Sequence, residues 1–134
     1  MSSILIDTNS YKKYLSGDQL TKDFLNEAEI VYLSSVVLGE LYAGFYGGNQ
    51  YNKNQEILKR FISKSSVRIL IVGMETAKIF GEIKNELKKR GTPIPINDIW
   101  IAASTVETGA VLISYDKHFL KIPGLRTWYH LKEI

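Results

Sequence analysis

Apolar residues are grouped along the chain in two ways, as short runs and at helical spacing. The short runs predict strands at residues 3–6, 30–33, 67–72, 110–114 and 125–129. Apolar residues at helical spacing predict helices near 8–15, 19–28, 35–47, 57–62, 75–90 and 97–108, with a short one at 116–120. Because strands alternate with helices, we expect a parallel sheet covered on both faces, a three-layer α/β fold.

Capping residues and glycines suggest where these helices begin and end. Thr8, Asn9 and Ser10 are typical N-cap residues, so one helix is expected to start among them. The loop 92–96 contains two prolines, each of which restricts the residue before it, so the next helix is expected to open at Asn97 or Asp98. We find no internal repeat or linker, which predicts a single domain over residues 1–134.

Composition excludes several classes of protein. The chain has 134 residues, of which 45% are hydrophobic and 23% charged, as in soluble globular proteins. It has no apolar run near the roughly 20 residues that cross a bilayer, and no basic region at its start, so neither a membrane span nor a signal peptide is expected. The absence of cysteine excludes disulfides, a thiolate nucleophile and a cysteine-rich zinc site. We therefore expect a cytoplasmic protein.

The net charge of +3 is a weak indication of a nucleic-acid partner, and the positions of the basic residues carry more information. One basic cluster is residues 88–90, and another, with Lys117, His118 and Lys121, follows Asp116. Either cluster could neutralise phosphates. Each could equally be a solvated helix end.

Three acids stand where predicted strands and helices meet. Asp7 ends the first strand, Asp98 opens the helix after the proline loop, and Asp116 follows the strand that ends at Ser114. In an open parallel sheet, ligands bind beyond the carboxyl ends of the strands. Glu40 differs, because it lies inside an otherwise apolar helix and points either to the polar edge of that helix or into a polar pocket.

Each acid alone has an ordinary explanation: Asp98 as an N-cap, Asp116 as a turn residue, Glu40 as a solvated helix residue. Asp7 is harder to explain, because a carboxylate at the end of a buried strand is costly unless it is paired or binds metal. Together the four predict a pocket for a hard cation, since oxygen-only ligands suit Mg²⁺ or Mn²⁺ rather than zinc. Such metals favour phosphodiester hydrolysis.

Four motifs, in order, resemble the PIN-domain ribonucleases, and specifically the toxin subunits of VapBC toxin–antitoxin pairs. The motifs are ILIDTNS at 4–10, LSSVVLGELYAG at 33–44, GTPIPINDIWIAA at 91–103, and LISYDKHF at 112–119 followed by IPGL at 122–125. The resemblance covers essentially the whole chain. It implies a Rossmann-like α/β/α fold with five parallel strands and a Mg²⁺- or Mn²⁺-dependent endoribonuclease.

By this resemblance, Asp7, Glu40, Asp98 and Asp116 correspond to the family's catalytic acids, with Asp7, Asp98 and Asp116 at the metal. Asn9 and Ser114 would support them; position 114 is commonly threonine in the family. Position 115, often asparagine, is tyrosine here. Lys117 and His118 are candidate contacts to RNA.

The resemblance also implies two protein partners, a second copy of the chain in a homodimer and a VapB-type antitoxin. Candidate apolar contacts for the antitoxin are Leu41, Tyr42, Phe45 and Tyr46, although each could equally pack in the core or at a dimer interface.

Three other functions share part of this pattern. A receiver-like signalling module needs an aspartate at the end of the central strand, and residues 72–74 contain none. A haloacid-dehalogenase-like phosphatase needs two acids after the first strand, where this chain has Asp7-Thr8-Asn9. A PIN fold that only binds RNA or protein remains the alternative, and the complete set of four acids argues against it.

Overall fold

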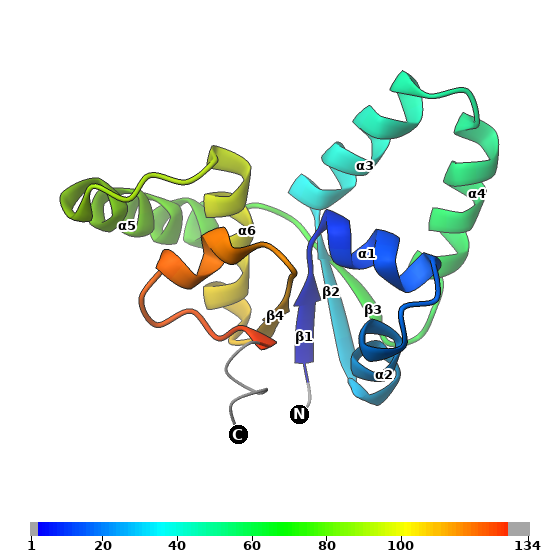
Figure 1. Ribbon diagram of the computed structural model, residues 1–134, viewed down its shortest axis with the longest axis horizontal. Helices are drawn as coiled ribbons and strands as arrows, with labels where there is room; N and C mark the ends of the chain where they lie inside the picture. The colour runs from blue at the N-terminus through cyan, green and yellow to red at the C-terminus, as the bar shows by residue number, and fades with distance from the viewer. Residues whose placement is uncertain (1–2, 129–134) are drawn as a thin grey trace.

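A parallel sheet forms the centre of the computed structural model, which describes residues 3–128 (Figure 1). Its strands are β1 (Ser3–Ile6), β2 (Ile30–Ser34), β3 (Val67–Leu70) and β4 (Val111–Ile113), in the spatial order β3-β2-β1-β4. The chain builds outward from β1 to β3 and then crosses back to place β4 on the other side of β1. The strand order therefore reverses between β1 and β4, where ligands bind in folds of this kind.

The helices lie on both sides of the sheet, as the two halves of Figure 1 show. One side holds α1 (Thr8–Leu15), α2 (Gln19–Glu27), α3 (Ser35–Gly47) and α4 (Tyr51–Ile62). The other holds α5 (Met74–Arg90), α6 (Ile96–Thr108) and the 3₁₀-helix η1 (Lys117–Lys121). The predicted three-layer α/β architecture with a parallel sheet is thus confirmed. No helix within residues 3–128 is long and apolar enough to cross a membrane.

The strands form the core because they are apolar on both faces, as expected for a parallel sheet covered by helices. Ile4, Leu5 and Ile6 of β1 are fully buried, and all three residues of β4 are nearly so. This continuous apolar packing fixes the carboxyl ends of β1 and β4 side by side, with Ile6 paired to Ile113.

The prediction of five strands is wrong for the part of the chain that the structure describes. The segment predicted at 125–129 makes only one parallel bridge, Leu112 to Thr127, supported by a hydrogen bond from the Leu112 amide to the Arg126 carbonyl. Two causes limit the pairing: β4 is three residues long, and the chain reaches its free edge only after a turn at Gly124, whose φ is +79°. Residue 129 lies outside the described residues.

Several predicted boundaries also shift. β3 ends at Leu70 rather than at residue 72, and α4 begins at Tyr51, six residues before the helix predicted near 57–62. The first helix is capped by Asp7 rather than by Thr8, Asn9 or Ser10. The helix expected to open at residue 97 or 98 begins at Ile96, with Pro95 as its N-cap. Asp98 is therefore in the first turn of α6 and is not its cap.

Candidate functional site

Asp7 lies at the carboxyl end of β1 and is 5% exposed. One of its carboxylate oxygens, Oδ1, accepts a hydrogen bond of 2.9 Å from the Ser10 amide and so caps α1. The Ser10 hydroxyl in turn donates to the Ile113 carbonyl at 2.6 Å. The start of α1 is thus joined to the end of β4, which holds the Asp7 carboxylate above both strands.

Ser114 connects two of the predicted acids. Its buried hydroxyl donates to Asp7 Oδ2 at 2.5 Å and accepts a 3.0 Å hydrogen bond from the Asp116 amide. Asp7 and Asp116 are far apart in sequence, so the register of β1 with β4 is what brings them to the same hydroxyl. Serine retains the hydroxyl that a threonine would provide, and the departure from the family pattern leaves this link intact.

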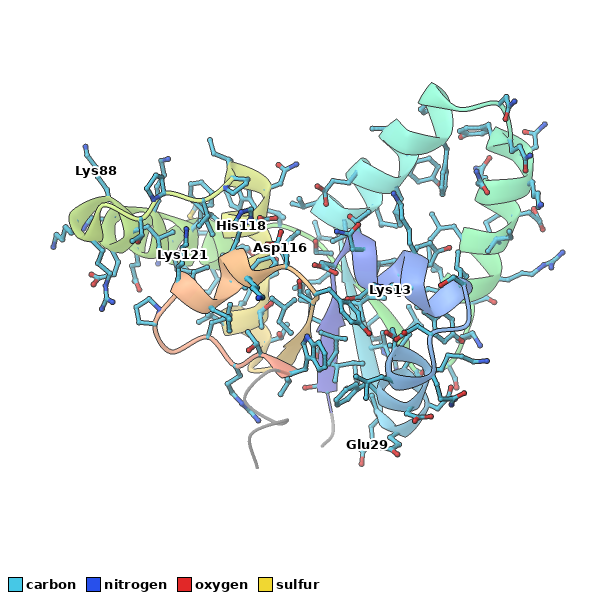
Figure 2. The ribbon with its side chains drawn as sticks, viewed as in Figure 1. Lys13, Glu29, Lys88, Asp116, His118 and Lys121 are labelled. Carbon is cyan, nitrogen blue, oxygen red and sulfur yellow. The ribbon has the colours of Figure 1, made fainter. Side chains whose placement is uncertain are left out.

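Asp116 is the N-cap of η1, where its Oδ1 accepts a hydrogen bond of 2.9 Å from the His118 amide. This turn brings the His118 ring back over the acid: Nδ1 is 3.0 Å from Asp116 Oδ1 and 3.2 Å from Asp98 Oδ2. Asp116 and His118 lie beside each other at the upper end of the sheet in Figure 2. The histidine therefore bridges two carboxylates that come from different segments.

Glu40 approaches from α3. Its Oε1 accepts a 2.7 Å hydrogen bond from the Thr8 hydroxyl, and its Oε2 lies 3.4 Å from the Asn97 side-chain nitrogen, a longer contact. Thr8 follows Asp7 and Asn97 precedes Asp98. The Glu40 carboxylate is therefore held between the two segments that carry those acids.

The pKa values of Asp7 and Asp98 respond to the charges of the other predicted acids. Burial raises the pKa of Asp7 above its ordinary 3.8, and the charge of Asp116 raises it further, against the hydrogen bonds from Ser114 and Ser10. Burial likewise raises the pKa of Asp98; the His118 hydrogen bond opposes this, while Asp116 and Glu40 add to it. Mutual repulsion of this kind is relieved when a cation binds.

The donor set fits a divalent metal ion. One ligand atom each from Asp98, Asp116 and His118 lie within 4.8 Å of one another. An imidazole nitrogen thus stands beside the carboxylates from which the oxygen-only site was predicted, and that ligand set stays a prediction. Carboxylates and imidazole together still suit a first-row divalent ion.

Reading the sequence missed several residues that support the acids. Thr8 and Asn97 adjoin two of the acids along the chain, which was the only signal available. Tyr115 was singled out for departing from the family pattern; its hydroxyl donates to Asp18 Oδ2 at 2.7 Å, and these two residues tie the loop before Asp116 to the turn between α1 and α2. This hydrogen bond is the first cause that lowers the Asp18 pKa to about 2.

Two predicted site residues, Asn9 and Lys117, are exposed. Asn9 is exposed on α1, and among the described residues no hydrogen bond joins its side chain to the carboxylates. Lys117 is exposed at the start of η1. Their supporting and RNA-binding roles stay predictions. His130, which was given no role, lies outside the described residues.

Comparisons with known proteins agree with this geometry. Residues 4–125 match the family model of the PIN domain. Ribonuclease VapC1 of Rickettsia felis is 33% identical over 125 residues, which cover 91% of this chain and 92% of that protein. Ribonuclease VapC2 of Haemophilus influenzae is 33% identical over 110 residues, covering 81% and 82% of the two proteins.

Solved structures give the same result for the fold. DNA-bound VapBC from Salmonella typhimurium matches with a TM-score of 0.82 at 26% identity, over 95% of this chain and 97% of that one. VapBC2 from Rickettsia felis bound to promoter DNA matches with a TM-score of 0.83 at 24% identity, over 93% and 96%. With both the sequence match and the fold in agreement, this chain belongs to the PIN domain family and, within it, to the VapC proteins.

Proposed function

We propose that this protein is a divalent-metal-dependent endoribonuclease, using Mg²⁺ or Mn²⁺, and that one PIN domain over residues 1–134 carries the activity. One observation carries the proposal: four carboxylates from separate segments converge at the carboxyl edge of the sheet, where the strand order reverses. The names of the curated relatives, among them a tRNA(fMet)-specific endonuclease VapC of Salmonella typhimurium at 26% identity, support RNA as the substrate.

Asp7, Asp98 and Asp116 would hold the metal, and Glu40 would position the metal or the attacking water. When bound there, the metal would supply an activated water and would stabilise charge on the phosphate and the leaving oxygen. Ser114 keeps the Asp7 carboxylate in place through its hydroxyl. Lys117, exposed beside this edge, would contact RNA phosphates. A phosphate contact of His118 stays a prediction.

Within the same proposal, the protein is a toxin that a VapB-type antitoxin inhibits. The VapBC complexes among the matching solved structures support such a partner. On α3, the predicted contacts range from buried Leu41 to Tyr46, which is 73% exposed and stacks near Tyr51 of α4 with ring centroids 4.7 Å apart. A homodimer and a cytoplasmic location stay predictions; light scattering of the purified protein tests the first.

The decisive experiment is cleavage of total cellular RNA by purified, antitoxin-free protein with Mg²⁺, with Mn²⁺ and with EDTA. Asp98→Asn is the test variant. Asp23→Asn is its matched control, because Asp23 is an exposed acid on α2 that contacts only Gln19 among the hydrogen bonds of the described residues. We expect discrete fragments that require metal, disappear with Asp98→Asn and persist with Asp23→Asn.

The absence of cleavage by folded protein in both metals would contradict the proposal and favour a PIN fold that only binds RNA or protein. Cleavage that persists in EDTA, or in Asp98→Asn, would contradict the metal-site assignment.

A further inference from the structure

His118 occupies the place where an additional metal ligand would stand. Its Nδ1 faces Asp98 and Asp116, at 3.2 and 3.0 Å from one oxygen of each. These two oxygens belong to carboxylates that the proposed function assigns to the metal. The histidine side chain is 45% exposed and the Asp98 side chain is 16% exposed, so the imidazole is more open to solvent than the carboxylate that it contacts.

The spacing agrees with ligands around a single ion. Metal–ligand distances of about 2.1 Å place neighbouring ligands of an octahedral ion about 3.0 Å apart. Both nitrogen–oxygen distances are near this value. Without a metal, a proton on Nδ1 accounts for the short contacts with the two carboxylate oxygens. A bound ion would take the place of that proton, and a neutral imidazole with its proton on Nε2 would then present the Nδ1 lone pair to the ion.

The fold, rather than a chance rotamer, places this ring. The His118 amide donates to Asp116 Oδ1, which fixes the first turn of η1. The next residue, Phe119, is 1% exposed and anchors the same turn in the core. The backbone at His118 is thus held on both sides, and the ring leaves it toward Asp98.

An imidazole changes which ion the pocket prefers. Mg²⁺ is a hard cation that is bound almost entirely through oxygen. Imidazole nitrogen suits transition-metal ions better than it suits Mg²⁺, and carboxylates suit Mn²⁺ as well as Mg²⁺, so a set that mixes carboxylates with imidazole favours Mn²⁺ over Mg²⁺. Asp98 and Asp116 alone would not make this distinction.

We propose that His118 Nδ1 is a ligand of the cation held by Asp98 and Asp116, and that this nitrogen gives the pocket a preference for Mn²⁺ over Mg²⁺. The inference rests on the metal pocket of the proposed function and adds to it a specific ligand and a specific ion.

The test measures binding of Mn²⁺ and of Mg²⁺ by calorimetry, without RNA, together with pulsed electron paramagnetic resonance of the Mn²⁺ complex. The test variant is His118→Asn, which offers an amide oxygen close to the position of Nδ1. The control is His130→Asn, because the sequence contains only two histidines.

We expect coupling of Mn²⁺ to an imidazole nitrogen in the wild type and in His130→Asn, and its loss in His118→Asn. The affinity of His118→Asn for Mn²⁺ should fall at least about 10-fold, since even residues behind the ligands often matter that much. Its affinity for Mg²⁺ should change by less than about threefold, because oxygen replaces nitrogen.

Bound Mn²⁺ without nitrogen coupling, or equal Mn²⁺ affinity in wild type and His118→Asn, would overturn the inference and leave the metal pocket and the ribonuclease standing. Coupling lost only in His130→Asn would also overturn it, by assigning the nitrogen to the other histidine. If the wild type binds neither ion and RNA cleavage needs no metal, the pocket itself is refuted, and this inference with it.

Discussion

The two halves of the carboxylate pocket are built differently. The strand half, Asp7 and Ser114, is buried at the ends of β1 and β4, and its hydroxyl–carboxylate bond is short. The helix half, Glu40, Asp98 and His118, is partly exposed and comes from α3, α6 and η1. The register of the sheet sets the positions of the side chains in the strand half. The positions of the side chains in the helix half depend instead on contacts between separate elements.

This difference indicates how each half affects the stability of the folded protein. Burial of an ionised carboxylate is unfavourable, so the strand half holds Asp7 in place at the expense of stability. The helix half costs less to assemble, but its contacts can adjust. Substitutions in the strand half should therefore change stability strongly, and substitutions in the helix half should change mainly metal binding and activity.

The largest expected effect comes from Asp7→Asn. Loss of a carboxylate that is proposed to bind the metal should lower RNA cleavage by at least about 100-fold, since a catalytic metal contributes several kcal/mol. The same change should raise the free energy of unfolding of the metal-free protein by about 1 kcal/mol, or roughly 3–5 °C in Tm. Asparagine remains a good N-cap for α1, so the helix start is kept.

Cleavage assays and thermal unfolding in EDTA measure the two effects, with Asp23→Asn as the control. A variant that is both inactive and clearly less stable would refute the idea that the buried charge of Asp7 is a cost to the fold.

The next largest effect is expected from Ser114→Ala. This variant removes the hydrogen-bond donor to Asp7 and the acceptor for the Asp116 amide, and leaving buried polar groups unsatisfied costs about 1–3 kcal/mol. Ser114→Thr retains the hydroxyl and is the matched control. Chemical denaturation of the two variants measures the difference, and equal stability would show that the hydroxyl does not support the strand half.

The pH dependence of Asp7 follows from the direction of its pKa. Its pKa in the folded protein is raised above 3.8, so the charged form is destabilising at neutral pH. As the pH falls through the raised pKa toward 3.8, folded Asp7 takes up a proton before the unfolded chain does, and the cost disappears. The stability advantage of Asp7→Asn should therefore be largest near pH 7 and shrink on acidification. Paired unfolding curves between pH 7 and pH 4 measure it, and a constant difference would contradict the assignment.

The smallest effect belongs to the contact between α1 and α3. Thr8→Val keeps the shape of the side chain but removes the hydrogen bond to Glu40, which is worth about 1 kcal/mol or less at a partly exposed site. We expect unchanged stability within about 0.5 kcal/mol and a few-fold loss of cleavage, with Thr8→Ser near wild type. A large loss of stability in Thr8→Val would mean that the helix half is as rigid as the strand half.

The sequence predicted the strand half better than the helix half, for physical reasons. An acid directly after a buried strand must lie at the edge of the sheet, so Asp7 could be placed from the pattern alone. The partners of Glu40 depend on how α3 packs against α1 and α6, and no local pattern encodes that packing.

Two errors have similar explanations. The prolines before α6 indicate where a helix cannot run, but they do not indicate that Pro95 itself is the N-cap. Asp98 was therefore expected at the start of α6, whereas it lies within the first turn. His118 was considered only as a basic residue. Its approach to Asp98 follows from the 3₁₀ turn that Asp116 caps, a geometry that hydrophobic spacing does not reveal.

The link from Ser114 to Asp7 joins residues separated by 107 positions. A ribosome adds about 5–20 residues per second, so roughly 5–20 s pass between synthesis of the first of these residues and the second. For most of that interval β1 lacks β4 and Asp98 is not yet made, and Asp116 is added only after Ser114. If the four acids form the catalytic site as proposed, a growing chain cannot cleave the RNA around it until nearly all of the fold has been translated.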